Sequence, residues 1–295
     1  MEHLLAYLGP TGTNSETAAG AYANWLKSNN SSGTLYGSRN PLGRERQQLA
    51  TLCPYPSIAL ALQAVVKGEA TQAVVPIENS IEGSVTIVLD TLWQSNLQVQ
   101  WELTIPIFHG LLTFSHSLEE LKTVYSHPQA LAQCQKWLEN YLPQVQLVPT
   151  KSTTEGIKLL KDDKSAAVVA SPKASKLYQV PLLKTDIKDN PDNCTRFWIV
   201  GSNPSELGSH LSLAFSLPQN GPGALVKALE IFARREINLS KIESRPTKRS
   251  LGEYIFFIDL EGNSHDPKIA EAITELSSCT EVIKTFGNYN ILNIT

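Results

Sequence analysis

Short apolar segments alternate with helical patterns along the first 200 residues, and this alternation constrains the fold more than any other feature. An apolar run at 3–9 precedes a helical pattern at 16–27, and a helical pattern at 57–68 leads to an apolar run at 72–77. Strands that alternate with helices are typical of α/β proteins. The sequence therefore predicts an α/β fold with mostly parallel strands.

Two polar stretches interrupt the pattern. Residues 28–52 are rich in Ser, Asn, Gly, Arg and Gln, so we expect a surface loop or a partly ordered insertion without a chemical role. Residues 201–209 are rich in Gly, Ser and Pro, which is typical of a linker. We expect the chain up to about residue 205 to form a separate domain.

The residues beyond this linker predict a second, smaller domain. Strand, helix, strand, strand, helix and strand are expected at 211–217, 224–236, 239–245, 253–260, 268–278 and 281–287. This βαββαβ order is that of a ferredoxin-like domain.

Composition narrows the choice of ligand and compartment. The chain has 295 residues, 42% of them hydrophobic, and a net charge of −3, so small molecules are expected as ligands and nucleic acid is not. Four dispersed cysteines without a CxxC pair argue against a zinc site and a disulfide framework, and favour the cytoplasm. No apolar run approaches the roughly 18 residues of a membrane span. The N-terminal segment reads as a strand and not as a signal peptide.

The stretch NPDNCTRFW at 190–198 is the most informative motif. A polar turn leads into Thr195, Arg196 and Phe197 at the start of an apolar strand. Loops that flank buried strands carry the functional residues of many α/β proteins. The triplet therefore offers a hydroxyl and a guanidinium side by side, although any strand can begin in this way.

Residues 9–16 form a glycine-containing loop between a strand and a helix. The free N–H groups and the dipole of the helix favour an anion there. The loop matches neither dinucleotide nor nucleoside triphosphate motifs, so a carboxylate is the better ligand. Alternatively, Thr13 or Ser15 only caps the helix.

Two further segments place polar residues beside apolar ones. Glu78, Asn79 and Ser80 follow a buried strand, where α/β folds bind ligands, although Ser80 could also belong to a helix start. His127 and Gln129 begin a predicted helix, where a lone histidine is more often a capping group than an acid or base.

Metal ligands are not expected. His109 lies in an apolar run and reads as a hydrogen-bonded core histidine. The other histidines and the acids show no ligand spacing, so we predict neither a metal nor a cofactor.

The second domain has one candidate ligand site. A turn with glycines lets a ligand approach the backbone, and it comprises Asn220, Gly221, Gly223, Ala224 and Leu225. The next strand ends in Glu243, Ser244, Arg245 and Pro246. These residues could also be a tight turn and a charged edge strand.

Together these segments resemble a known family. Four of them stand in the order and at similar spacing to those of prephenate dehydratases: 9–16, 76–84, 126–130 and 190–198. A Thr-Arg-Phe triplet marks the active site in that family. The two segments of the second domain resemble the ligand-binding elements of the ACT domain that follows many of these enzymes.

The resemblance implies a catalytic domain at 1–205 with two lobes and a cleft between them, like a type II periplasmic binding protein. Lobe one would comprise 1–77 and 175–205, lobe two 78–174, and the ACT domain 211–295. Paired ACT domains of this family bind phenylalanine between them. The resemblance thus implies a homodimer or homotetramer that phenylalanine inhibits.

The implied reaction converts prephenate to phenylpyruvate, carbon dioxide and water, with aromatisation as the driving force. Thr195 would contact the leaving hydroxyl, and Glu78 would donate a proton if burial raised its pKa. Asn79 and Ser80 complete the implied catalytic set. Substrate contacts would come from Thr13, Ser15, Arg196, Phe197, His127 and Gln129.

Two alternatives remain open. Arogenate dehydratase has the same fold and chemistry but takes a substrate with an amino group in place of the ketone. A non-catalytic amino-acid or carboxylate sensor is the alternative of another class, and the intact Thr-Arg-Phe triplet argues against it.

Overall fold

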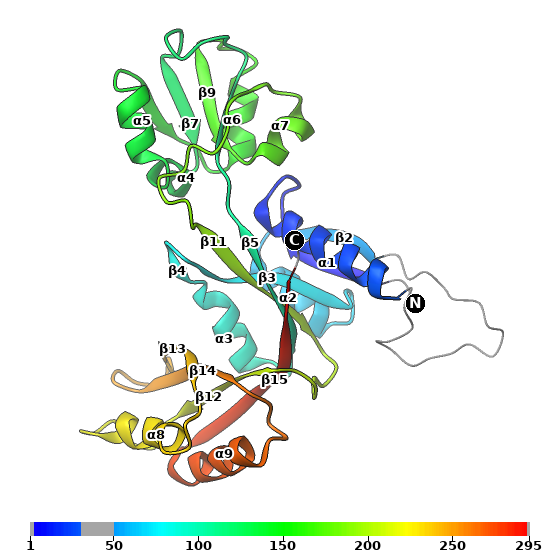
Figure 1. Cartoon of the computed structure of the whole chain (residues 1–295), viewed down its shortest axis with the longest axis vertical. Coiled ribbons are helices and arrows are strands. Elements are labelled where there is room, and N and C mark those ends of the chain that lie inside the picture. Colours follow the sequence, from blue (N-terminus) through cyan, green and yellow to red (C-terminus); the bar gives the residue numbers. More distant parts are fainter. Residues whose placement is uncertain (1–2, 31–49, 294–295) are drawn as a thin grey trace, which may run out of the picture.

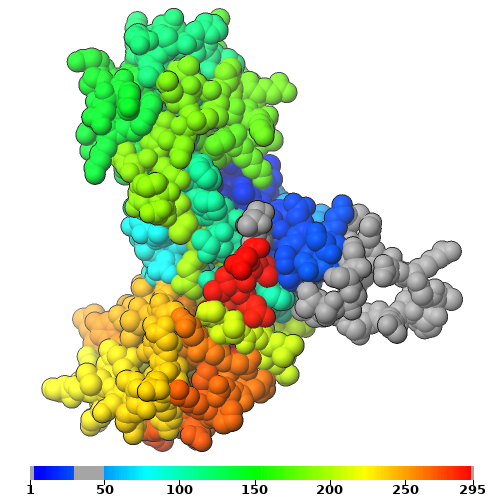
Figure 2. Space-filling view, in the orientation of Figure 1, coloured from blue at the N-terminus to red at the C-terminus, as the bar shows by residue number. Residues whose placement is uncertain are grey.

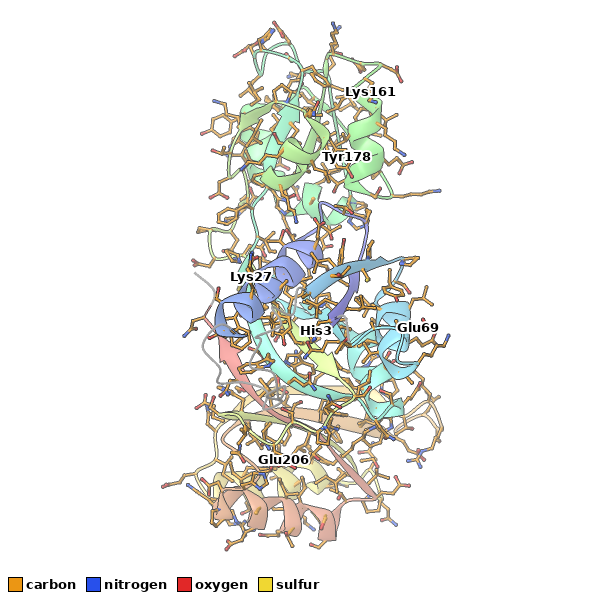
Figure 3. The ribbon with its side chains drawn as sticks, turned by 90° about the vertical axis from the view of Figure 1, so that its right-hand side faces the viewer. His3, Lys27, Glu69, Lys161, Tyr178 and Glu206 are labelled. Carbon is orange, nitrogen blue, oxygen red and sulfur yellow. The ribbon has the colours of Figure 1, made fainter. Side chains whose placement is uncertain are left out.

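The computed structural model describes residues 3–30 and 50–293. Three bodies are stacked along its long axis (Figure 1, Figure 2). Figure 3 shows the stack from the side, with Lys161 in the upper body, His3 in the middle body and Glu206 near the start of the lower body. In that order we call the bodies lobe two, lobe one and the C-terminal domain.

Lobe one contains a sheet with the strand order β5-β11-β3-β1-β2. These strands are β1 (His3–Leu8), β2 (Ala50–Tyr55), β3 (Gln72–Asn79), β5 (Gln98–Pro106) and β11 (Cys194–Gly201), and short β4 (Gly83–Ser84) pairs with β3. The helices are α1 (Asn14–Asn30), α2 (Ile58–Val66) and α3 (Thr86–Gln94). Leu5 and Tyr7 of β1 pack on α1, whereas Ala6 packs on α2 and α3. Helices therefore cover both faces.

Lobe two contains a sheet with the strand order β10-β6-β9-β7-β8. These strands are β6 (Gly110–Thr113), β7 (Thr123–Ser126), β8 (Gln146–Pro149), β9 (Ala166–Ala170) and β10 (Leu182–Lys184). The helices are α4 (Pro128–Ala132), α5 (Gln135–Tyr141), α6 (Thr153–Leu159) and α7 (Pro172–Tyr178).

The expectation of mostly parallel strands is confirmed only in part. β1, β2 and β3 are parallel, as are β7, β8 and β9. β11 runs antiparallel to β3 and to β5, because it brings the chain back from lobe two.

The division between the lobes differs from the expected one. Residues 78–106, expected in lobe two, form β4, α3 and β5 of lobe one. β10, expected in lobe one, pairs with β6 of lobe two. The chain therefore crosses at 107–109 and 185–193, because β5 must lie beside β11 to complete the sheet of lobe one.

The C-terminal domain has the predicted βαββαβ order. Its elements are β12 (His210–Ser216), α8 (Ala224–Ala233), β13 (Leu239–Pro246), β14 (Tyr254–Glu261), α9 (Pro267–Cys279) and β15 (Val282–Leu292). Residues of α8 and α9, such as Phe232 and Leu276, pack with Leu213 and Ile258 of the sheet.

β15 joins this domain to lobe one. Its first part pairs with β12, and Asn290–Leu292 continue parallel to β5, so that one sheet runs through both bodies. Phe257 and Tyr289 share a core with Val75 and Trp198 of lobe one. A chain ending near residue 205 would lose this strand and expose that core. This shared sheet and core argue against the expectation that the chain up to residue 205 folds by itself.

The segment expected as an insertion is only partly described. Its residues 28–30 belong to the end of α1 and its residues 50–52 to β2, which pairs with β1, and the rest lies outside the described residues. Nowhere in the described ranges is a helix both long and apolar enough to cross a membrane.

Candidate active site

A cleft of about 550 Å³ lies between the two lobes. Lobe one lines it with the β1–α1 loop, the end of β3 and the start of β11, and lobe two with the first residues of α4, α6 and α7. Predicted site residues that line the cleft are Thr13, Ser15, Asn79, His127, Gln129, Thr195 and Phe197. The lining contributed by described residues contains one lysine, Lys151, and no carboxylate.

Thr195 and Asn79 form a hydrogen-bonded pair in this lining. Thr195 is 8% exposed, and its Oγ1 accepts a hydrogen bond from Asn79 Nδ2 at 2.9 Å. Asn79 Oδ1 accepts in turn from the backbone N–H groups of Ile81 (3.0 Å) and Glu82 (3.1 Å). The amide is therefore fixed with its N–H group toward Thr195. The Thr195 proton is left for a group in the cleft.

A second row of polar side chains supports Asn79. Asn79 Nδ2 lies 3.0 Å from Asn193 Oδ1, and Asn193 Nδ2 donates to Gln133 Oε1 at 3.0 Å. His109 Nε2 lies 2.8 Å from the same Gln133 oxygen. Sequence reasoning missed Asn193 and Gln133. The available signal for Gln133 was its position one helical turn after Gln129.

His109 also lines the cleft, although the sequence indicated only a core residue. Gln133 Oε1 can only accept, so His109 Nε2 carries the proton of their bond and Nδ1 is left as an acceptor. This Nδ1 is buried without a partner among the described residues. Burial lowers the pKa of His109 and outweighs the hydrogen bond to Gln133, which raises it. The lowered pKa favours the neutral ring.

The glycine-containing loop contributes the start of α1. Thr13 Oγ1 accepts the N–H of Glu16 at 3.3 Å, so Thr13 caps the helix and lines the cleft at once. The N–H groups of Asn14 and Ser15, in the first turn, have no acceptor within the helix. The helix dipole makes this end of the cleft favourable for an anion.

Glu16 joins this loop to lobe two. Its Oε2 accepts the N–H of Gly12 at 2.9 Å and lies 2.5 Å from Lys173 Nζ of α7. Burial alone raises the pKa of Glu16, but Lys173 and the Gly12 N–H outweigh it and leave that pKa below its ordinary value. The Lys173 charge balances that of Glu16.

Lobe two faces this loop with side chains at helix starts. His127 Nδ1 accepts the N–H of Gln129 at 3.3 Å, and Ser152 Oγ accepts the N–H of Glu155 at 3.2 Å. Lys151, directly before Ser152, brings a positive charge to the cleft. Sequence reasoning missed Lys151. Ser152 and Glu155 have the spacing of a capping box, which could have indicated this helix start.

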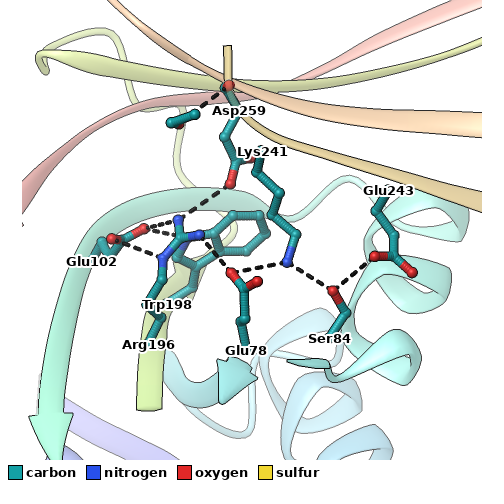
Figure 4. Close-up of polar contacts among 9 residues, drawn as sticks. Glu78, Ser84, Glu102, Arg196, Trp198, Lys241, Glu243 and Asp259 are labelled. Carbon is teal, nitrogen blue, oxygen red and sulfur yellow. Dashed lines mark hydrogen bonds and ion pairs between the residues drawn. The ribbon is translucent and has the colours of Figure 1, made fainter. Parts of the chain in front are cut away.

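Thr195 lines the cleft and Arg196, the next residue of β11, does not. Figure 4 shows Arg196 among charged side chains of lobe one and the C-terminal domain. Arg196 binds Glu102 through Nε (3.1 Å) and Nη2 (2.6 Å), and reaches Glu78 (2.9 Å) and Asp259 (3.2 Å). The prediction that Arg196 contacts substrate is wrong, because successive side chains of a strand point to opposite faces.

Glu78 lies on that same face. Its Oε2 is 2.9 Å from Arg196 Nη1 and 3.1 Å from Lys241 Nζ. Burial alone raises the pKa of Glu78, but these two cations outweigh it and leave the pKa below its ordinary value. The prediction of Glu78 as a proton donor in the cleft is therefore wrong.

Ser80 and Phe197 have supporting positions. Ser80 is exposed outside the cleft lining, and its Oγ accepts the N–H of Cys194 at 3.1 Å, which ties the end of β3 to the start of β11. The structure therefore gives Ser80 a supporting contact, and its direct role in the cleft stays a prediction. Phe197 is 1% exposed and packs in the core with Leu5 and Tyr7 while it also borders the cleft.

The C-terminal domain has a hollow of about 300 Å³ on its surface, here called the ACT hollow because of its place in the predicted ACT domain. Predicted residues that line it are Asn220, Gly221, Gly223, Ala224, Leu225 and Ser244. Pro246 does not line it. Glu243 and Arg245 lie on the other face of β13, where they bind Ser84 (2.8 Å) and Asp90 (3.2 Å). Because side chains alternate along a strand, Glu243 and Arg245 point away from the face of Ser244, and their predicted ligand role is wrong.

The described residues hold no group of three or more His, Cys, Asp or Glu side chains that could bind a metal ion. The donors of the cleft are hydroxyls, amides, imidazoles, backbone N–H groups and one ammonium. Fold and cleft together define a two-lobed α/β protein whose cleft is lined with groups that can bind a small anion, joined to a ferredoxin-like domain.

Comparison with known proteins identifies the family. A prephenate dehydratase profile matches residues 5–205, and an ACT domain profile matches residues 212–278. The bifunctional chorismate mutase/prephenate dehydratase of Aquifex aeolicus is 41% identical over 221 residues, which are 75% of this chain and 61% of that longer protein. The prephenate dehydratase of Lactococcus lactis subsp. cremoris is 38% identical over 252 residues, 82% of this chain and 90% of that protein.

A solved structure agrees. The prephenate dehydratase of Arthrobacter aurescens in complex with L-Phe superimposes with a TM-score of 0.80 and 33% identity, over 97% of this chain and 90% of that one. The chain belongs to the prephenate dehydratase family and ends in an ACT domain.

Proposed function

We propose that the cleft between the lobes is where this prephenate dehydratase converts prephenate to phenylpyruvate, carbon dioxide and water. The observation that carries the proposal is the Thr195–Asn79 pair, a buried hydroxyl in the cleft lining that accepts a hydrogen bond from Asn79 and so keeps its own proton available as a donor. Aromatisation supplies the driving force. The protein has to orient a dianion and stabilise a departing hydroxide.

The carboxylates of the substrate meet donors from both lobes. Lobe one offers the first turn of α1 with Thr13 and Ser15, and lobe two offers Lys151 and Gln129. An ammonium and free N–H groups suit carboxylates. Substrate that touches both sides also favours the closed arrangement in which Glu16 and Lys173 pair.

Thr195 donates its proton toward the ring hydroxyl as the carbon–oxygen bond breaks. The electron pair of the bond between the ring and its carboxylate moves into the ring, and carbon dioxide leaves. Prephenate dianion and one proton give phenylpyruvate anion, carbon dioxide and water, so the proton that Thr195 donates is replaced from solvent. Asn79 keeps the hydroxyl oriented throughout.

Prephenate suits this cleft better than arogenate. The described lining has donors for a keto group, whereas it has no carboxylate to pair with the ammonium of arogenate. Purified full-length chain should turn over prephenate to phenylpyruvate with a much higher kcat/KM than it turns over arogenate to phenylalanine. Absence of turnover with prephenate would contradict the proposed function.

Phenylalanine is the proposed effector, bound at the ACT hollow. The turn 220–225 offers backbone groups to its carboxylate and ammonium, and Tyr254 and Phe256 offer apolar surface to its ring. Phenylalanine can slow catalysis only by binding one arrangement of the assembly more tightly than another.

Gly221→Val tests this site. A Cβ at Gly221 meets no atom within 4 Å, so the side chain would enter the ACT hollow without a clash in the fold. Gly223 is the poorer choice because its φ of 78° strains any other residue. The variant should need at least 10-fold more phenylalanine for half inhibition, with kcat unchanged. Unchanged inhibition would place the effector elsewhere.

Assembly and compartment follow from the same proposal. Ile242 and Val226 lie 48% and 65% exposed beside the ACT hollow, which supports a homodimer or homotetramer with paired ACT domains. The four cysteines form no disulfide with one another, which suits the reducing cytoplasm. Sedimentation with and without phenylalanine tests the assembly.

A further inference from the structure

β3 and β11 carry two consecutive cross-strand pairs that face opposite sides of the sheet. Thr195 pairs in register with Asn79, and Arg196 with Glu78. The first pair faces the cleft, and the second faces the ACT domain (Figure 4). Because both pairs belong to the same two backbones, the backbone offers a direct route by which a shift of the second pair can reach the first.

The ACT domain holds the second pair directly. Lys241 Nζ lies 3.1 Å from Glu78 Oε2, and Asp259 Oδ2 lies 3.2 Å from Arg196 Nη2. The side chains of Lys241 and Asp259 are only 8% and 3% exposed. Charges buried to this extent depend on their partners, so the contacts resist separation.

The strand that carries Lys241 also borders the ACT hollow. Ser244 lines that hollow from one face of β13, whereas Lys241 and Glu243 extend from the other face toward lobe one. Ser84 Oγ links the latter two, since it accepts from Lys241 Nζ at 2.9 Å and donates to Glu243 Oε2 at 2.8 Å. A shift of β13 is therefore transmitted to the ends of β3 and β11.

We infer that Lys241 is a positioning residue for the Thr195 hydroxyl. Through Glu78 and Arg196 it sets the alignment of the Thr195–Asn79 pair, and through β13 it couples that alignment to occupancy of the ACT hollow. The inference rests on the proposed roles of Thr195 and of phenylalanine.

The test compares Lys241→Met and Lys241→Arg with the full-length wild type, with prephenate as substrate. Lys241→Met should lower kcat roughly 2- to 30-fold with KM within about two-fold, which is the range of mutations along a coupling network. Saturating phenylalanine should leave a larger fraction of its activity than in the wild type. Lys241→Arg keeps the charge, so its kcat and its inhibition by phenylalanine should both stay close to those of the wild type.

Lys268→Met is the matched control, because Lys268 is an exposed lysine of the same domain on α9. It should leave kcat and inhibition unchanged. Lys241→Met with wild-type kcat and wild-type inhibition would overturn the inference. A KM that rises together with the fall in kcat would also overturn it, since a loosened cleft would then explain the loss.

If Lys241→Met does not fold, Ser84→Ala replaces it. This variant removes only the hydroxyl between Lys241 and Glu243, and it should make inhibition by phenylalanine less complete. Unchanged inhibition in Ser84→Ala would then overturn the inference. Wild-type chain without turnover overturns the proposed function itself, and the inference with it.

Discussion

The two faces of the β3–β11 pair differ in chemistry. On the cleft face Thr195 and Asn79 are neutral and joined by one hydrogen bond, whereas on the other face Arg196 and Glu78 are charged and bound to the ACT domain. A guanidinium in the cleft would bind the dianion in the ground state as firmly as in the transition state, which does not raise kcat. The charged residues of the β3–β11 pair therefore hold the domains together, whereas its neutral residues carry the proposed chemistry.

The largest effect should come from Thr195→Val, which keeps the shape of the side chain and removes its hydroxyl. Loss of one donor that acts on the transition state costs about 10²–10³ in kcat. Steady-state kinetics should show this loss with KM within a few-fold, and Thr195→Ser should recover much of it. A valine variant that keeps half of the wild-type kcat would move the chemistry away from the cleft face.

Lys151→Met should mainly affect substrate binding. We expect KM to rise roughly 10-fold, because a charge-assisted hydrogen bond to a carboxylate is worth about 1.5–3 kcal/mol and the exposed position of Lys151 places its contribution at the low end of that range. Lys158→Met, an exposed lysine of α6, is the control. Equal KM values for both variants would remove Lys151 from the site.

Glu78→Gln distinguishes the two faces most simply. A general acid lost from the cleft typically costs 10²–10⁴ in rate, whereas a residue that acts by alignment should cost only about 2- to 30-fold. The pH profile of kcat should keep its shape, since the Glu78 carboxyl does not titrate in the proposed reaction. A loss above 100-fold with a missing limb of the profile would restore Glu78 as the acid.

The ion pairs between α3 and the C-terminal domain should respond to acid. The pKa of Asp90 is held below its ordinary value, since Arg245 and Lys248 outweigh the effect of burial. The unfolded state therefore takes up protons first as pH falls below about 5, and the free energy of unfolding decreases until the pH is below the folded pKa. The midpoint temperature of thermal unfolding should fall less between pH 7 and pH 3 for Asp90→Asn than for the wild type. Parallel curves for variant and wild type would contradict this.

Removal of metal ions should have the smallest effect. The proposed reaction stabilises charge with Lys151, the start of α1 and Thr195, so activity after exhaustive chelation and dialysis should equal that of untreated protein. Loss of activity that one divalent ion restores would show that the cleft depends on more than the residues named.

The sequence predicted the α/β lobes, the ferredoxin-like order and the segments that meet at the cleft, because strand–helix alternation and turn residues are local signals. It did not predict that β15 continues into the sheet of lobe one, because pairing between distant strands leaves no local signal. Lys151 was missed for a similar reason, since only the fold brings α6 opposite α1.

The sequence alone could have shown that Arg196 and Glu78 lie on the sheet face opposite to Thr195 and Asn79. Alternation along a strand places neighbours on opposite faces, so Thr195 and Arg196 could not both point into one cleft. Which of the two faces is the cleft depends on the crossing of β5 and β11 between lobes. The lobe bounds that the resemblance implied placed this crossing near the end of β3 and within α7, because nothing local in the sequence shows that β5 pairs with β11.

The most direct test of the division between the two faces is calorimetric titration of prephenate into Thr195→Val. The account predicts binding with a Kd within about three-fold of the wild-type KM and almost no phenylpyruvate formed, because the substrate carboxylates are held by other groups and the hydroxyl acts only as the bond breaks. No detectable binding, or binding with wild-type turnover, would contradict it.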